Sequence, residues 1–283
     1  MKNITARSIN KNADPKLRTL YDLKKTNMKK VIFLFVLLTL FSSKFVLAES
    51  INNKDAMQAN QTLDIKQQSI ISISALTAKG ELVQLKKALN DGLDAGLTIN
   101  QIKEVLVHLY AYCGFPRSIR GLQTFMSVLE DRKVKGINDE QGATASPIID
   151  GRSKYERGKE ILEKLTMSKQ NASLTSYAAF APIIDTFLKE HLFSDIFERD
   201  VLSYAQRELV TVSVLTAIGG VEPMLRSHLG ICLNIGITSV QLQEFIGIIK
   251  STIGEKEADA AKLVLTEVLK ATTSQNSSEN VHR

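Results

Sequence analysis

Cysteine is scarce in this chain of 283 residues, which contains only Cys113 and Cys232. Two thiols at irregular spacing are too few for the disulfide framework of a small extracellular domain or for a structural zinc site. Both lie in apolar helical contexts, so we expect buried free thiols, with a disulfide in an oxidising compartment as the alternative. No cluster of histidine and carboxylate residues has the spacing of metal ligands, so the sequence predicts no metal site.

Alternating strand patterns are absent as well, because no stretch of useful length switches regularly between apolar and polar residues. Apolar residues instead recur at three- and four-residue spacing, which is typical of amphipathic helices. The helices predicted outside the central motif span Ile70–Ala78, Leu82–Ala95, Ile99–Tyr112, Phe115–Asp131, Tyr155–Leu165 and Ser176–Glu190, the last with Pro182 near its first turn. The sequence therefore predicts an all-α protein.

The basic excess of the chain belongs to its first 48 residues. The whole chain carries a net charge of +6, whereas residues 1–48 contain ten Lys or Arg and two acids and so contribute +8. The rest of the chain is therefore near −2, and we expect no nucleic-acid partner.

Residues 28–48 have the layout of a secretory signal. Met28 is followed by two lysines, an apolar run over residues 31–41 and a small-residue ending at Ala48. We expect cleavage after Ala48, a periplasmic or secreted protein, and no membrane contact after cleavage. The run is short for a membrane span, and an uncleaved anchor is the alternative. Residues 1–27 precede a complete signal, so we interpret Met28 as the initiator.

The helical region contains a duplicated unit. A shift of 140 residues aligns helix-cap and core positions with identical residues, namely Gly80 with Gly220, Leu85 with Leu225, Leu89 with Leu229, Leu93 with Leu233, Gly96 with Gly236, Thr98 with Thr238, Gln101 with Gln241, Glu104 with Glu244 and Gly114 with Gly254. Two such units can bury their apolar faces against each other. The predicted organisation is an extension and signal (1–48), a flexible lead-in (49–69), a first repeat (70–133), a linker with a short helix (134–175), a second repeat (176–270) and a disordered tail (271–283).

The polar residues of most interest lie between Ser203 and Thr238. A capping box begins one helix at Ser203, and two consecutive glycines end it before the next helix starts. Glu208 and His228 lie 20 residues apart on these two antiparallel helices. The two side chains can therefore face each other across the helix pair.

This stretch also carries a family resemblance. The sequence RELVTVSVLTAIGGVEPMLRSHLGICLNIGIT resembles the central motif of the carboxymuconolactone decarboxylase family, the all-helical group that includes alkylhydroperoxidase D-like proteins. EVLVHLYAYCGFPR, in the first repeat, resembles the closing motif of the same family, and the resemblance covers roughly residues 70–270. It implies a two-repeat helical bundle and a homo-oligomer, for which we expect a trimer of two-repeat chains. It also implies a lyase-like or isomerase-like reaction, without cofactor, on a small-molecule substrate that is a carboxylic acid or lactone.

The two repeats retain different halves of the family pattern, which favours one composite site. His228 in the second repeat has Ala88 as its counterpart, whereas the first repeat retains His108 and Tyr112. The predicted catalytic residues are His228, Glu208 and His108, and the predicted substrate-binding residues are Arg226, Tyr112 and Arg207. The alternative for each is a structural role, such as a packed histidine, an ion pair of Glu208 with a neighbouring arginine, or a solvated Arg226.

Two other functions are alternatives. A thiol peroxidase of this fold needs a Cys-x-x-Cys pair before the histidine, and Val221 and Met224 occupy those positions here. Disulfide exchange has no chemical basis without that dithiol. A non-catalytic helical oligomer or binding protein is the second alternative, because the first repeat has lost part of the pattern.

Overall fold

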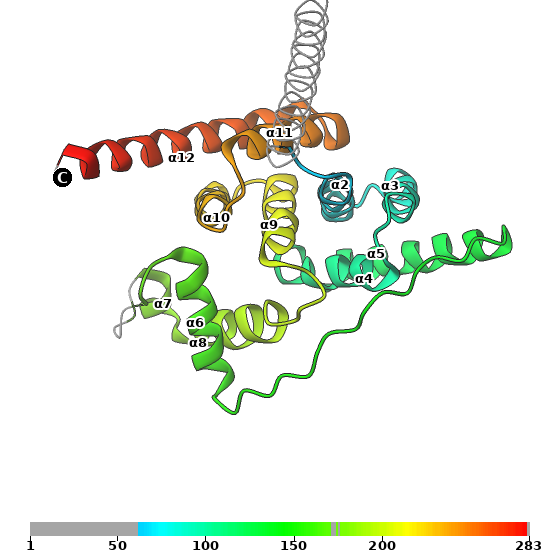
Figure 1. Cartoon of the computed structure of the whole chain (residues 1–283), viewed down its shortest axis with the longest axis horizontal. Helices are drawn as coiled ribbons and strands as arrows, with labels where there is room; N and C mark the ends of the chain where they lie inside the picture. The colour runs from blue at the N-terminus through cyan, green and yellow to red at the C-terminus, as the bar shows by residue number, and fades with distance from the viewer. Residues whose placement is uncertain (1–61, 171–173, 175, 282–283) are drawn as a thin grey trace, which may run out of the picture. The chain divides into compact units, whose positions relative to one another are not determined.

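The computed structural model describes residues 62–170, 174 and 176–281, with side chains up to residue 273. All regular structure in these ranges is helical, which confirms the all-α prediction. The helices are α2 (Ile65–Lys79), α3 (Leu82–Asp94), α4 (Ile99–His108), α5 (Tyr110–Val134), α6 (Lys154–Thr166), α7 (Ser176–Phe180), α8 (Pro182–Phe187), the π-helix η1 (Leu188–Ile196), α9 (Tyr204–Ile218), α10 (Glu222–Asn234), α11 (Ser239–Ile253) and α12 (Glu255–Val281) (Figure 1). The predicted secretory signal lies outside the described residues. Within them, we find no helix of the length and apolarity that crossing a membrane requires.

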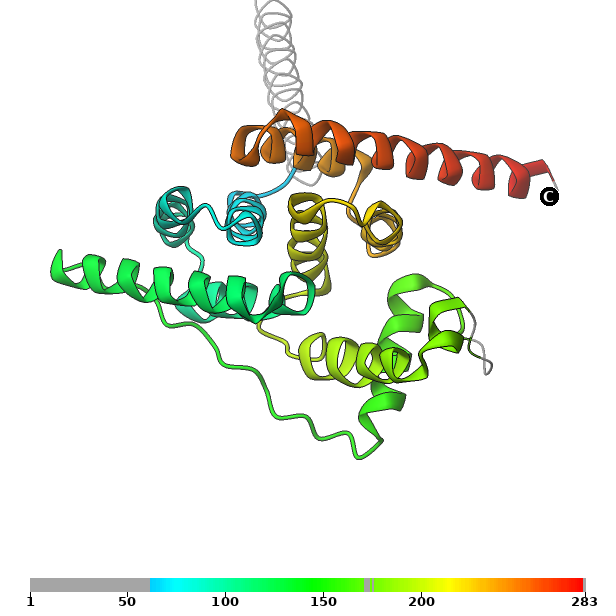
Figure 2. The same cartoon turned by 180° about the vertical axis from the view of Figure 1, so that it is seen from behind.

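Helices α2 and α9 pack against each other at the centre of the fold (Figures 1 and 2). Both begin with a capping box, formed by Asp64 and Gln67 on α2 and by Ser203 and Gln206 on α9. Every residue of α9 from Arg207 to Ala217 is buried. A helix that is apolar on all sides has to be surrounded by other elements, and here the two repeats surround it. The one arginine and the one glutamate of α9 are thereby held inside the core.

The four helices α2 to α5 recur as α9 to α12. Gly96 after α3 and Gly236 after α10 have φ values of 87° and 92°, and Thr98 and Thr238 then begin α4 and α11 with the same capping box. Positive φ favours glycine, which explains why this residue marks both turns. The periodicity in the sequence therefore corresponds to a repeated set of helices.

The segment between the two sets contains α6 and η1, which cross each other closely. A Cβ atom on Gly158 of α6 would lie 1.7 Å from the backbone carbonyl oxygen of Lys189 on η1, so only glycine fits at this crossing. Their apolar side chains form a second, smaller core that includes Phe193 and Phe197 and also contacts Ile231 of α10. The α6–η1 pair is thus attached to the second repeat through α10.

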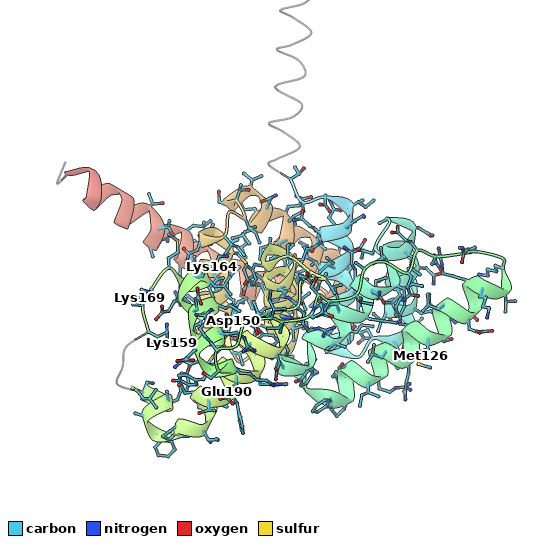
Figure 3. The ribbon with its side chains drawn as sticks, turned by 60° about the horizontal axis from the view of Figure 1, so that its bottom comes forward. Met126, Asp150, Lys159, Lys164, Lys169 and Glu190 are labelled. Atoms are coloured by element: carbon cyan, nitrogen blue, oxygen red, sulfur yellow. The ribbon has the colours of Figure 1, made fainter. Side chains whose placement is uncertain are left out.

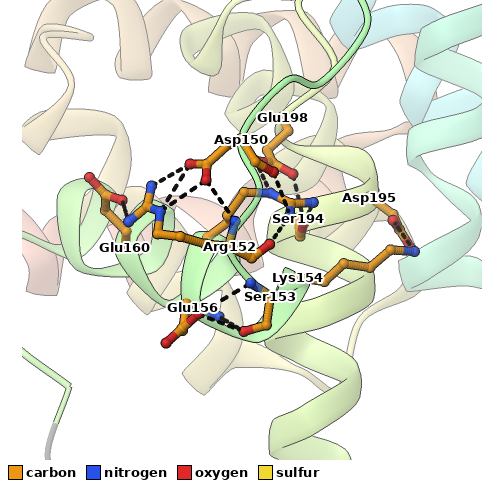
Figure 4. Close-up of polar contacts among 10 residues, drawn as sticks. Asp150, Arg152, Ser153, Lys154, Glu156, Glu160, Ser194, Asp195 and Glu198 are labelled. Atoms are coloured by element: carbon orange, nitrogen blue, oxygen red, sulfur yellow. Dashed lines mark hydrogen bonds and ion pairs between the residues drawn. The ribbon is translucent and has the colours of Figure 1, made fainter.

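A polar network around Arg157 of α6 joins the loop before this helix to the end of η1 (Figure 4). The Arg157 Nε atom donates to Glu198 at 2.8 Å, and its Nη2 atom donates to Ser194 at 3.2 Å. The Arg152 guanidinium forms a bidentate contact with the Asp150 carboxylate in the preceding loop. These contacts position the residues that lead from η1 into α9.

Several predictions about helices were wrong. The lead-in expected to be flexible over residues 49–69 already contains the start of α2, which begins at Ile65 and not at Ile70. The helix expected over residues 176–190 is broken at Ala181, because the following Pro182 lacks an N–H group and disfavours helical geometry in the residue before it. The chain continues as a π-helix instead. The tail expected to be disordered from residue 271 is helical as far as Val281, as a continuation of α12.

Candidate active site

Glu208 and His228 form a hydrogen-bonded pair between α9 and α10. The Nδ1 atom of His228 lies 2.8 Å from Oε2 of Glu208. Glu208 is fully buried, whereas the His228 side chain is 13% exposed at the edge of the core. Since a carboxylate accepts the Nδ1 proton, a neutral His228 keeps its lone pair on Nε2. The arrangement provides an oriented imidazole that can act as a base or, when protonated, as an acid.

The second oxygen of Glu208 has no partner among the described residues. Oε1 is buried and accepts no hydrogen bond. A buried acceptor without a donor is unfavourable, and such atoms occur where a ligand or an ordered water completes the contact. The pair therefore offers one acceptor to an incoming molecule.

The first repeat contributes two aromatic rings to the same place. The centroid of the Tyr112 ring lies 5.6 Å from that of His108 and 6.0 Å from that of His228, at 84° to the latter. The charge of Glu208 acts on Tyr112 and, after burial itself, contributes to a raised pKa of the phenol. The structure thus brings the predicted residues of both repeats together within one chain.

His108 differs from the prediction of a catalytic residue, because both of its ring nitrogens are already occupied. Nδ1 lies 3.2 Å from Nη1 of Arg207, and Nε2 lies 3.0 Å from the Thr211 hydroxyl. An arginine only donates, so Nδ1 accepts and Nε2 carries the hydrogen. Burial, with the nearby charges of Arg207 and His228, holds the pKa of His108 well below its usual range. His108 is therefore a neutral, buried ring that supports the site without a free atom for a substrate.

Arg207 also differs from its predicted role of binding substrate. Its guanidinium is fully buried, and Nη2 donates to Glu104 at 2.8 Å and to the carbonyl of Arg199. Burial lowers the pKa of Arg207, and the ion pair with Glu104 opposes this shift. Burial raises the pKa of Glu104, but hydrogen bonds from Arg199 and Arg207 outweigh it and leave that pKa below its usual value. We name these three residues the Arg–Glu–Arg cluster, and its role is to join α4 to α9.

Arg226 is not part of the site. It is half exposed on α10 and pairs with Glu267 of α12. The prediction that its guanidinium holds a substrate carboxylate is therefore not supported, because α10 directs His228 toward α9 and Arg226 toward α12.

Both cysteines are free in the structure; Cys232 is buried, as expected, whereas Cys113 is only partly buried. Cys232 is fully buried, and burial followed by the charge of Glu208 raises its pKa well above the usual value. Burial raises the pKa of Cys113 to about 11, and its thiol donates to the Leu109 carbonyl at 3.2 Å. Neither thiol is a thiolate near neutral pH, so neither is a ready nucleophile.

Three residues of the site were missed in the sequence. Glu104 could have been found, because the repeat aligns it with Glu244, although Glu244 instead accepts from the backbone of Leu63. Arg199 and Thr211 carry no comparable signal, since a polar residue near a helix start and a threonine in an apolar helix are both common. Only the packing of α9 against α4 and α5 shows that they belong here.

A cleft of about 370 Å³ lies near the site. The rings of Tyr204 and Phe197 stand between this cleft and His108. Tyr204 lines the cleft and stacks on Phe197 at 6.3 Å, and Phe197 in turn lies 5.2 Å from His108. The ammonium of Lys164, which is labelled in Figure 3, lies 5.2 Å above the Tyr204 ring. The cleft is thus adjacent to the site but separated from it by these rings.

No three His, Cys, Asp or Glu side chains in the described part of the chain are grouped as metal ligands.

Comparison with known proteins identifies the relatives of this sequence. The sequence model of the Carboxymuconolactone decarboxylase family matches residues 50–125 and 184–267, one match in each half. The 4-carboxymuconolactone decarboxylase of Acinetobacter baylyi (strain ATCC 33305 / BD413 / ADP1) is 31% identical over 118 residues, which are 41% of this chain and 87% of that protein.

Proposed function

Because this chain belongs to the carboxymuconolactone decarboxylase family, we propose that it is a cofactor-free carboxy-lyase acting on a small carboxylic acid or lactone. The observation that supports this most is the Glu208–His228 pair, in which one carboxylate oxygen orients the imidazole and the other is unpartnered. A carboxylate and an imidazole in contact are the groups that acid–base chemistry requires. The Tyr112 ring contacts the imidazole edge-on, at 6.0 Å between centroids.

In the proposed reaction the substrate carboxylate leaves as CO₂, and its bonding electron pair passes into the rest of the molecule as an enolate. His228, as an imidazolium, then transfers one proton from Nε2 to the carbon that lost CO₂. Glu208 stabilises the imidazolium before the transfer through the Nδ1 contact of 2.8 Å. Each turnover consumes one proton, which solvent returns through the partly exposed His228 ring.

Neither of the two arginines predicted to bind substrate is free to hold the departing carboxylate. Arg207 uses both terminal nitrogens within the chain, and Arg226 lies on the surface beside α12. A substrate carboxylate close to the Glu208 carboxylate, with no cation between them, is repelled, whereas uncharged CO₂ is not. The missing partner therefore favours decarboxylation over tight binding of the acid.

The test is turnover of 4-carboxymuconolactone, followed as release of CO₂, for the wild type and Glu208→Gln, with His228→Ala as a second variant. Loss of an acid–base group costs about 10²–10⁴-fold in kcat, and we expect a loss in this range from His228→Ala. Glu208→Gln should also lower kcat, because the imidazolium then lacks its carboxylate partner. Arg226→Ala is the control and should leave kcat unchanged. An active His228→Ala variant would contradict the proposal, as would a wild type inactive on this acid and on other small carboxylic acids and lactones.

Export and assembly are further parts of the proposal. The signal pattern at residues 28–48 supports a periplasmic or secreted location. Large apolar side chains exposed on α7 and α8 support a homo-oligomer, and Phe180 is 93% exposed. A monomer seldom leaves such a cluster in water, and we infer a trimer of two-repeat chains.

Peroxide reduction is disfavoured. Val221 and Met224 occupy the positions of the required dithiol, and the pKa of each cysteine thiol is raised by burial.

A further inference from the structure

The Thr211 hydroxyl joins the two aromatic residues of the first repeat. Thr211 lies on α9, one turn after Arg207, and is fully buried. Its Oγ1 atom is 3.0 Å from Nε2 of His108 and 3.1 Å from the Tyr112 hydroxyl. No other side chain of the second repeat forms a hydrogen bond with both rings among the described residues.

The direction of these hydrogen bonds follows from Arg207. Because Arg207 donates to Nδ1 of His108, Nε2 carries the hydrogen and donates to Thr211. The Thr211 oxygen then has one hydrogen of its own, with the Tyr112 hydroxyl at 3.1 Å and the Arg207 carbonyl at 3.0 Å within reach. The Tyr112 hydroxyl is thus the last member of a series of hydrogen bonds that begins at the Arg207 guanidinium and passes through His108 and Thr211.

Glu208 is a second acceptor in the neighbourhood of that hydroxyl, because it binds the His228 ring that the Tyr112 ring contacts. Its charge acts on Tyr112, and its Oε1 atom is a buried acceptor without a donor. Without Thr211, the Tyr112 ring is free to shift its hydroxyl toward this oxygen, and a hydrogen bond to a carboxylate is stronger than one between neutral groups. The acceptor that a ligand needs would then be occupied.

We propose that Thr211 is a positioning residue that holds the Tyr112 hydroxyl away from Glu208 and so keeps Oε1 open to an O–H or N–H group of the ligand. Thr211 touches no reacting atom itself. The Tyr112 ring contacts His228 edge-on at 6.0 Å, so the same hydroxyl also determines the environment of the imidazole. The inference rests on the proposed function for its catalytic consequence but not for its geometry.

Two substitutions separate the hydroxyl of Thr211 from its methyl group. Thr211→Val keeps the shape and removes the hydroxyl, whereas Thr211→Ser keeps the hydroxyl and removes the methyl group. Ser213→Ala is the matched control, because Ser213 is a buried residue on the same helix whose hydroxyl donates to the Leu209 carbonyl, at 2.6 Å. Circular dichroism establishes that each variant is folded.

The first measurement is the NMR chemical shift of the His228 ring protons at fixed pH, which respond to the position of the Tyr112 ring. Four histidines make the spectrum simple, and a His228→Gln spectrum assigns the signals. We expect Thr211→Val to move them, and Thr211→Ser and Ser213→Ala to leave them near the wild-type positions. Equal shifts in the Val and Ser variants, or unmoved signals in the Val variant, would overturn the inference.

The second measurement is turnover of 4-carboxymuconolactone. We expect Thr211→Val to lower kcat by roughly 10- to 100-fold, since a displaced group near a reacting centre can cost about 10²-fold. Thr211→Ser should retain wild-type kcat, whereas a packing role predicts the reverse order and would refute the proposal. If the wild type does not turn over but the NMR pattern is as expected, the positioning by Thr211 stands and the proposed reaction fails.

Discussion

Removing the buried guanidinium of Arg207 should destabilise the fold strongly, and Arg207→Met is the variant that tests this. Methionine retains a similar length and apolar volume while it removes every donor. The change deprives Glu104 of one of its two arginine partners and His108 of the donor to Nδ1. Both of these residues are buried, so water cannot easily replace what is lost.

The expected loss is about 3–5 kcal/mol in the free energy of unfolding. Removing one partner of a buried ion pair costs about 3–5 kcal/mol, and the remaining contact of Glu104 is with Arg199, whose side chain is 42% exposed and therefore screened by water. An unpaired Nδ1 of His108 adds about 1–3 kcal/mol. The substitution also removes the buried Nε atom of Arg207, which has no partner, and this offsets part of the loss.

Urea denaturation followed by circular dichroism measures the effect. Arg226→Met is the control, because its pair with Glu267 is exposed and worth at most about 1 kcal/mol. The double variant Glu104→Gln and Arg207→Met should lose less than the sum of the two single variants, since it leaves no buried carboxylate unpaired. A loss below about 1 kcal/mol for Arg207→Met would refute the reasoning, and strict additivity in the double variant would do so independently.

Three further predictions concern pH, processing and assembly. The folded chain keeps His108 neutral, because burial depresses its pKa, whereas the unfolded chain binds a proton below about pH 6.5. The stabilisation from a neutral His108 is thus fully present above about pH 6.5 and is lost as the pH falls, by up to about 1.4 kcal/mol per pH unit. Urea titrations between about pH 7.5 and 5 measure this dependence, and His108→Gln should flatten it. Mass spectrometry of the protein exported by its native host should find an N-terminus at or near Glu49, and a mature protein starting at Met1 would contradict export. Light scattering at micromolar concentration should give the mass of a trimer, and a monomer would remove the basis for an oligomer.

Much of the fold could be predicted from local signals in the sequence. Glycine after α3 and α10, with threonine two residues later, marks turns whose positive φ and capping boxes depend on those residue types alone. The repeat was visible for the same reason, since cap and core positions are determined by neighbouring residues. The break at Pro182 was underestimated, because a proline at a helix start and one that separates two short helices look alike in sequence.

The site was predictable only in part. Glu208 and His228 were identified as a pair because two consecutive antiparallel helices bring residues 20 positions apart into contact, and this requires no knowledge of the rest of the chain. Arg207 and Arg226 could not be assigned in this way, since an arginine can reach in many directions and its partner decides its role. Glu104 and Glu267, from distant parts of the sequence, proved to be those partners.

The helices, their caps and the duplication were determined by the sequence itself, because each depends on residues within a few positions of one another. Which polar atoms are satisfied was decided only by the tertiary structure. Packing of α9 against α4 and α5 occupies both nitrogens of His108 and attaches Tyr112 to Thr211, and it leaves one oxygen of Glu208 without a donor in the described part of the chain. These contacts join residues about 100 positions apart, and no local pattern specifies them, since they exist only once both repeats bury the same helix.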